Sequence, residues 1–174
     1  MVDPLFKRIA GIHEQEDGVI GAVWLAYNKD RDLIHVYDAC LFKQEVLAVI
    51  AEGINCRGRW IPIAWNDKAK DLSDKLLMDR GCNMLKDGCN TAERYVEVTA
   101  RDVWERMRTA RFKVDPRLKE WTDEFEAYYK DGVKLPKESS PLMSATLNAV
   151  DQLPYARRQA TRTHKNMAPK LAIV

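Results

Sequence analysis

Residues 7–40 read KRIAGIHEQEDGVIGAVWLAYNKDRDLIHVYDAC, and this stretch decides the fold. It contains three apolar runs rich in β-prone residues, at 7–13, 19–27 and 33–40. Two polar segments separate the runs, and both have the composition of turns. Short apolar runs bounded by turn residues are typical of strands, and tight turns join neighbouring strands in antiparallel order. The sequence therefore predicts a three-stranded antiparallel meander at the start of the chain.

The period of the apolar residues changes after the meander. Helical spacing appears at 44–56 and 69–80, and an apolar strand with a proline lies between them at 60–65. A further short strand is predicted at 81–85 and a brief extended piece at 112–114. Three later helices are predicted, the first with Thr99 as its N-cap and running to about 109, the second following Pro116, and the third running from 142 to 150.

A meander that leads into alternating strands and helices predicts an α/β fold. We expect a mixed sheet, three antiparallel strands followed by parallel ones, flanked by helices as in RNase H-like domains. The chain has 174 residues, which is enough for one domain with a real core. Pro154 is taken as the end of that domain, so residues 1–154 are expected to form the RNase H-like domain and 155–174 a flexible basic tail.

Composition limits the class of protein. Hydrophobic residues make up 46% and charged residues 31%, which is typical of a globular domain and not of a disordered chain. No apolar run is long enough to span a bilayer, and no signal peptide is recognisable, so a cytoplasmic setting is expected. The four cysteines form no C-x-x-C pair and are interpreted as reduced thiols.

Five segments, in order along the chain, resemble the C-terminal nuclease domain of the large terminase subunit of phages and prophages. They are Ala22–Asp32 (AVWLAYNKDRD), Trp60–Asp67 (WIPIAWND), Glu105–Val114 (ERMRTARFKV), Trp121–Tyr128 (WTDEFEAY) and Leu142–Thr146 (LMSAT). The similarity extends over roughly residues 7–152. The weaker alternatives are a fragment of another RNase H-like enzyme, such as a resolvase or a transposase.

The resemblance implies an endonuclease that cuts concatemeric double-stranded DNA during genome packaging in the host cytoplasm. Portal protein and terminase small subunit are the partners it implies, with no membrane contact. Two Mg²⁺ or Mn²⁺ ions activate water and stabilise the leaving oxygen in such enzymes, and both ions prefer carboxylate ligands. In this family those acids come from the first strand, the end of the fourth strand and a late helix. No Walker-type ATPase motif occurs in the sequence, so the motor half is not expected in this chain.

Only part of that acid set is present. Asp67 matches the strand-four position and is predicted to be catalytic and to bind metal. At the strand-one position this chain has His13, where the family has aspartate, and Ser140 stands where a late acid is expected, so both are candidate site residues. Asp17 and Glu138 are the nearby acids predicted to serve as metal ligands.

Three interpretations of this altered set stay open at this point. The chain is a decayed prophage copy with little nuclease activity, a deliberately inactivated form, or a nuclease that uses displaced acids. The displaced acids would be Glu14, Glu16, Asp17 or Glu138. A neutral imidazole does not bridge two magnesium ions as a carboxylate does, which favours loss or strong impairment of cleavage with residual manganese-dependent activity. A non-catalytic module that binds DNA or the portal is the matching functional alternative.

Basic residues give candidates for DNA contact. Lys68 and Lys70 flank Asp67, Arg108 and Arg111 lie on a predicted helix and its exit, and the tail contributes Arg157 and Arg158. Five basic residues and no acid lie between 156 and 170; without them the chain has 23 basic against 26 acidic residues. The five tryptophans lie in apolar patterns and are predicted to pack in the core.

Overall fold

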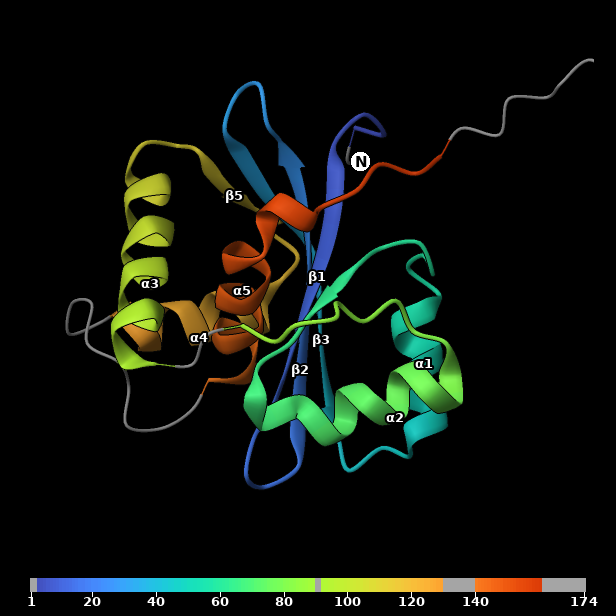
Figure 1. Ribbon diagram of the computed structural model, residues 1–174. Helices are drawn as coiled ribbons and strands as arrows, with labels where there is room; N and C mark the ends of the chain where they lie inside the picture. The colour runs from blue at the N-terminus through green and yellow to red at the C-terminus, as the bar shows by residue number, and fades with distance from the viewer. Residues whose placement is uncertain (1–2, 90–91, 130–139, 161–174) are drawn as a thin grey trace, which may run out of the picture.

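The computed structural model describes residues 3–89, 92–129 and 140–160 (Figure 1). Five strands form one sheet in the order β4-β1-β2-β3-β5. The meander is confirmed: β1 (Lys7–Glu14), β2 (Val19–Asn28) and β3 (Leu33–Lys43) lie side by side and antiparallel. The register shifts once, between Trp24 and Leu25 of β2.

Parallel strands complete both edges of the sheet. β4 (Ile63–Ala64) pairs with β1, and β5 (Phe112–Val114) pairs with β3. The expectation of a mixed RNase H-like α/β sheet is therefore confirmed. The strand predicted at 60–65 is shorter than expected, because Pro62 has no amide hydrogen to donate and pairing begins after it. The strand predicted at 81–85 is reduced to an isolated bridge from Met84 to Ile63.

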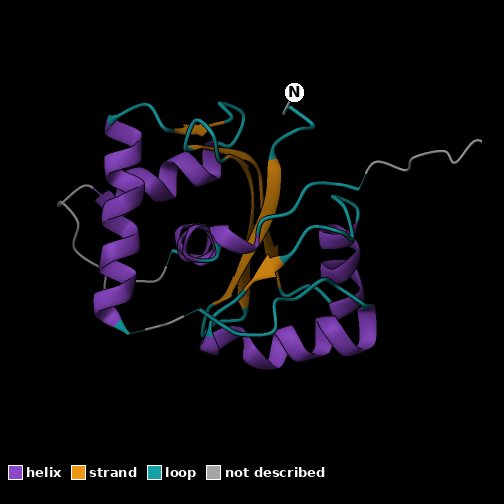
Figure 2. Ribbon diagram, turned by 45° about the horizontal axis from the view of Figure 1, so that its top comes forward, coloured by secondary structure: helices purple, strands orange, loops and turns teal. Residues whose placement is uncertain are grey.

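Helices cover both faces of the sheet, as Figure 2 shows. On one face, α1 (Leu47–Asn55) and α2 (Lys70–Arg80) pack on side chains such as Ala10 and Ile12. On the other face lie α3 (Glu93–Arg108), α4 (Lys119–Tyr129) and α5 (Pro141–Asp151), against residues such as Ile9. Strand alternation explains the division, since successive residues of β1 point to opposite faces. Two short 3-10 helices, η1 (Asp67–Ala69) and η2 (Leu153–Tyr155), follow β4 and α5.

Helix α3 begins six residues before the predicted N-cap. Thr99 lies within it, and its hydroxyl donates to the carbonyl of Tyr95 one turn earlier. Among the side chains of α3 only Ala100 and Val103 are buried, so the first turns carry little apolar periodicity from which sequence could place the start.

Helix α5 lies directly on the sheet, with nearly every side chain buried. Its backbone approaches β1 and β2 at two glycines: a β-carbon on Gly11 would overlap the carbonyl oxygen of Ala145, and one on Gly21 would overlap that of Pro141. Gly21 pairs with His13 across the two strands. The first turn of α5 is therefore held next to the end of β1.

Trp121 connects α4 to α5 in the core. It is 1% exposed, stacks on Phe112 and Phe125, and its indole N–H donates to the hydroxyl of Thr146 at 2.9 Å. That hydroxyl donates in turn to the carbonyl of Leu142 at 2.7 Å.

Replacing Thr146 with valine keeps the shape of the side chain but leaves the buried indole N–H without an acceptor. We expect the free energy of unfolding to fall by about 1–2 kcal/mol, measured by chemical denaturation. Thr146→Ser, which keeps the hydroxyl, is the control. If valine proves no worse than serine, the Trp121 hydrogen bond contributes nothing to stability.

Candidate functional site

Two parallel strands end side by side at one edge of the sheet. Gly11 of β1 pairs with Ala64, the last residue of β4, and two residues further along the two segments His13 lies beside Asn66. The amide nitrogen of Asn66 donates to Nδ1 of His13 at 3.1 Å, and both side chains are buried. In open α/β sheets, ligands bind beyond the carboxyl ends of parallel strands, so this is the first place to look for a site.

Helix α5 supplies the third side of the same site. Asn148 is 7% exposed, and its amide nitrogen donates to the carbonyl of Ile12 at 2.8 Å. Ser144 lies one turn earlier, so both residues are on one face of the helix. A cavity of about 150 Å³ lies between these elements, and its walls are Asn66, Lys68, Val96, Ser144, Leu147 and Asn148.

The cluster of His13, Asn66, Ser144 and Asn148, which we call the neutral cluster, carries no carboxylate. Burial, and to a smaller extent the positive charge of Lys68, together lower the pKa of His13 from 6.5 to about 4, and the hydrogen bond from Asn66 opposes this shift. The imidazole is therefore neutral at pH 7. The side-chain oxygen of Asn66 is buried and has no hydrogen-bond partner among the described residues.

The shifted pKa makes a prediction about stability. Between about pH 6.5 and about pH 4 the unfolded chain takes up a proton on His13 that the folded chain does not. The contribution of His13 to the free energy of unfolding is therefore fully present above pH 6.5 and is lost as the pH falls, by about 3 kcal/mol once the pH is below 4.

Chemical denaturation of the unchanged chain and of His13→Gln at several pH values measures this contribution of His13 to the free energy of unfolding. Carboxylates titrate in the same range, so the difference between the two proteins isolates the imidazole. Parallel pH profiles for the two proteins would contradict a buried neutral His13.

The predicted site residues Asp67, Asp17 and Ser140 belong to three different segments of the structure. Asp67 is the first residue of η1 and is exposed. Asp17 lies in the β1–β2 turn, where its carboxylate accepts the N–H of Val19 at 3.0 Å. Glu138 lies outside the described residues. Ser140 is the N-cap residue of α5, and its carbonyl accepts the N–H of Ser144.

Strand alternation explains why Asn66 reaches His13. Ala64 faces α5 while Ile63 and Trp65 face α1 and α2, so the next residue toward α5 is Asn66. Asn66 and Asn148 were not selected from the sequence. The period of two along 63–66 could have identified the first. The i, i+4 spacing of Ser144 and Asn148 could have drawn attention to the second.

A half-buried acid that sequence reasoning did not select supports this end of α5. One carboxylate oxygen of Glu124 accepts the N–H groups of Leu142 and Met143, at 2.9 and 3.2 Å. Burial raises the pKa of this carboxyl group, and the two N–H donors partly offset that shift. Glu124 thus caps α5 and helps to fix the helix whose Ser144 and Asn148 line the cavity.

The donor set does not fit a pair of magnesium ions. Within 3–89, 92–129 and 140–160, no group of three His, Cys, Asp or Glu side chains comes together to hold a metal ion. The neutral cluster offers amides, a hydroxyl and an imidazole, whereas Mg²⁺ prefers several charged oxygens. A metal held here would depend on exposed acids outside the cluster.

The basic residues predicted to contact DNA are divided between the two ends of the sheet. Lys68 and Lys70 are exposed beside the neutral cluster. At the other end, Arg111 pairs with Asp32 at 2.6 Å, while Arg108 pairs with Glu105 at 3.1 Å. Arg157 is joined to Arg8 of β1 through two backbone hydrogen bonds, so the structured chain extends past Pro154. Arg158 follows it and is exposed.

No described helix is both long and apolar enough to cross a membrane. No protein-family model matches the sequence, and no curated protein matches it.

Solved structures do resemble the fold. The P22 large terminase nuclease domain matches with a TM-score of 0.76 and 18% identity, over 91% of this chain and 87% of that one. The large terminase nuclease domain of bacteriophage SPP1, with bound Mn, matches with a TM-score of 0.65 and 18% identity, over 82% and 84%. A large terminase from a thermophilic bacteriophage, in complex with ADP, matches with 0.66 and 12% identity, over 90% of this chain but 42% of that one. This chain therefore has the fold of the nuclease domains of large terminases.

Proposed function

We propose that this chain is a DNA-binding module of the terminase nuclease lineage that acts on concatemeric double-stranded DNA during genome packaging, with metal-dependent cleavage lost or strongly reduced. The neutral cluster carries the proposal. Three elements converge at the end of the sheet where the sequence predicts the nuclease site, and the side chains on them there are His13, Asn66, Ser144 and Asn148. Two metal ions that share a site need negative ligands to offset their charge.

The same end of the sheet keeps features suited to a DNA backbone. Lys68 lines the cavity and Lys70 follows on the first turn of α2, both exposed to solvent. Lysine side chains at this position can neutralise phosphates without reading the base sequence. Binding of duplex DNA therefore does not require the missing carboxylates.

The setting follows from the lineage. The neighbouring SPP1 nuclease domain contains Mn, and for this chain Mg²⁺ or Mn²⁺ is the ion that residual cleavage would use. Portal protein and terminase small subunit are the proposed partners beside DNA, and the host cytoplasm is the proposed location.

One observation favours a second candidate, an active endonuclease with displaced acids. Asp67 is adjacent to Asn66, and Glu14 is adjacent to His13, at the ends of two neighbouring strands. Their carboxylates would approach a metal from outside the cavity.

A plasmid assay separates the two candidates. The purified chain is incubated with supercoiled DNA and Mg²⁺ or Mn²⁺, beside Asp67→Ala and a sample with EDTA. We expect nicking to stay at the level of the EDTA sample. Cutting that disappears in Asp67→Ala would establish the active nuclease and refute the proposed loss.

Duplex binding is measured separately, as a function of salt. Replacing Lys68 and Lys70 with alanine should reduce the slope of log K against log salt by about 0.9 for each phosphate that the protein no longer neutralises. Lys119→Ala, at the start of α4, is the matched control for an exposed lysine. An unchanged slope in the Lys68/Lys70 variant would show that duplex DNA does not bind at this end of the sheet.

A further inference from the structure

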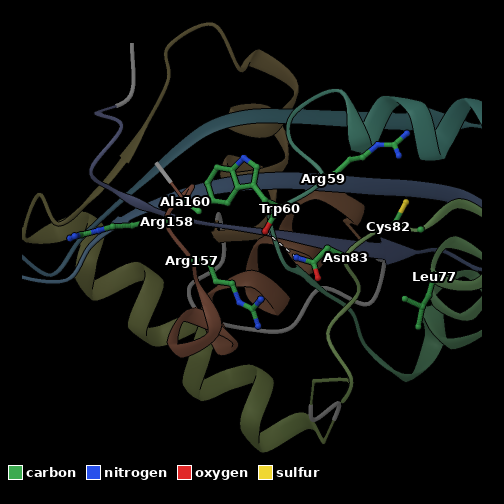
Figure 3. Close-up of a pocket in the computed structure, with 9 residues that line it drawn as sticks. Arg59, Trp60, Leu77, Cys82, Asn83, Arg157, Arg158 and Ala160 are labelled. Carbon is green, nitrogen blue, oxygen red and sulfur yellow. Dashed lines mark hydrogen bonds between the residues drawn. The ribbon is translucent and has the colours of Figure 1, made fainter. Parts of the chain in front are cut away.

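Two adjoining cavities lie at the end of the sheet opposite the neutral cluster. Their volumes are about 640 and 1060 Å³, and they share Trp60, Arg158 and Ala160. Figure 3 shows Trp60 among the residues that line the smaller cavity, between Arg158 on one side and Arg59 on the other, with Arg157 below it. We call the two cavities together the arginine groove.

The charge of the arginine groove has one sign. Its described lining includes five arginines and no aspartate or glutamate; the arginines are Arg8, Arg57, Arg59, Arg157 and Arg158. Two of them are engaged within the protein, since Arg57 pairs with Asp38 at 2.8 Å and Arg8 lies over the ring of Tyr37. The other three form no ion pair within the described part of the chain.

The fold builds this groove from segments far apart in sequence. Arg8 is the second residue of β1, and Trp60 precedes β4, which runs parallel to β1, so both lie where these strands begin. The backbone of Arg157 pairs with Arg8, which brings the last described segment to the same place. The carbonyl of Trp60 accepts the side-chain amide of Asn83 at 3.0 Å, which fixes the backbone beneath the ring. Positive side chains that line one groove without a carboxylate among them create a positive potential there, which attracts anions.

We propose that the arginine groove binds a single-stranded segment of nucleic acid, with phosphates on Arg59, Arg157 and Arg158 and a base against Trp60. Duplex DNA presents phosphates to a protein but keeps its bases stacked, so a half-buried indole in a cavity would gain nothing from it. An unpaired strand offers both, and basic grooves with an aromatic platform bind such strands with little sequence preference.

The proposal extends the proposed function and rests on it only in taking nucleic acid as the ligand. The groove lies at the opposite end of β1 and β4 from Lys68 and Lys70, so the two surfaces can be altered independently. A strand that leaves the neutral cluster, or a frayed DNA end, would be a suitable occupant.

Fluorescence anisotropy tests it with a labelled oligothymidine of about 10 nucleotides, within the size range of single-strand sites, and with a duplex of equal length. Trp60→Leu should weaken oligothymidine binding at least about fivefold and leave duplex binding unchanged. Trp60→Phe, which restores a stacking surface, should recover most of that affinity. The double variant Arg59→Ala with Arg158→Ala should lower the salt slope for the oligothymidine by about 1.4.

Arg94→Ala, an exposed arginine on α3, is the matched control for charge, and thermal denaturation confirms that each variant is folded. Equal effects of Trp60→Leu and Trp60→Phe would overturn base stacking. A decrease in affinity that is equal for duplex and oligothymidine would overturn the preference for single strands. If replacing Lys68 and Lys70 leaves duplex binding unchanged, the proposed duplex surface is wrong, but the oligothymidine results can still be interpreted. The variants of the arginine groove keep both lysines.

Discussion

A chain with His13→Asp, Asn66→Asp and Ser144→Asp is expected to bind Mn²⁺ and to nick supercoiled plasmid, while the unchanged chain stays at the level of the EDTA control. His13 and Asn66 are in contact, and Ser144 and Asn66 line one cavity, so the three carboxylates would converge there. Without metal their charges repel each other, and burial opposes their ionisation. A divalent ion removes both costs at once.

Thermal denaturation gives a readout that does not depend on cleavage. At a Mn²⁺ concentration about 100 times its Kd, binding adds about 2.7 kcal/mol to the free energy of unfolding, so the variant should gain melting temperature with Mn²⁺. The control is His13→Asn with Asn66→Asp and Ser144→Asn, which has similar volume and one carboxylate. A triple aspartate variant that folds but gains no stability with Mn²⁺ would mean that the three positions do not form a metal site.

Replacing Gly11 with alanine is expected to cost at least about 3 kcal/mol of folding free energy, at or above the upper end for overpacking of a core. The added methyl group would overlap the carbonyl oxygen of Ala145 and lie 3.0 Å from the side chain of Ala149. Because the obstacle is the backbone of α5, a change of rotamer cannot relieve it. The helix would have to move away from the sheet, and Asn148 would lose its hydrogen bond to Ile12.

Chemical denaturation measures the effect, and Gly18→Ala provides the comparison. Gly18 has a φ of 81°, but nothing lies within 4 Å of an added β-carbon, so only backbone strain of about 1–2 kcal/mol is expected there. An equal loss of folding free energy at the two positions would show that α5 can move away from β1 with little loss of stability.

Much of the fold could be predicted because it is written in local patterns. Each such pattern depends only on residues close in sequence. Examples are the three apolar runs of the meander, the helical spacing before Gly58 and Gly81, and the proline that opens α5. The pairing of β5 with β3 could not be read in this way. The three residues at 112–114 do not indicate that their partner strand lies almost 80 residues earlier in the chain. The position of β5 beside β3 depends on how α3, which precedes it, packs on the sheet.

The sequence placed the candidate site at the end of one strand but did not identify which side chains contact one another there. Strand position indicated Asp67, whereas contact with His13 is made by Asn66, because the period of two fixes which residue faces α5. The predicted DNA contacts illustrate a similar limit. Arg111 is basic in sequence, but in the structure it pairs with Asp32. Hydrogen bonds from Arg106 and, to a smaller extent, from Arg111 keep the pKa of the Asp32 carboxyl group below its usual value.

The sequence by itself determined the meander, the class of the sheet and the change of residue type at position 13, since these depend on local periodicity and on residue identity. Only the tertiary structure decided which side chains meet. The contacts of His13 with Asn66, of Asn148 with Ile12, and of Arg157 with Arg8 join residues 53, 136 and 149 positions apart. Such contacts are set by the register of parallel strands and by the depth to which α5 packs on two glycines, and neither quantity is encoded in any one segment of the chain.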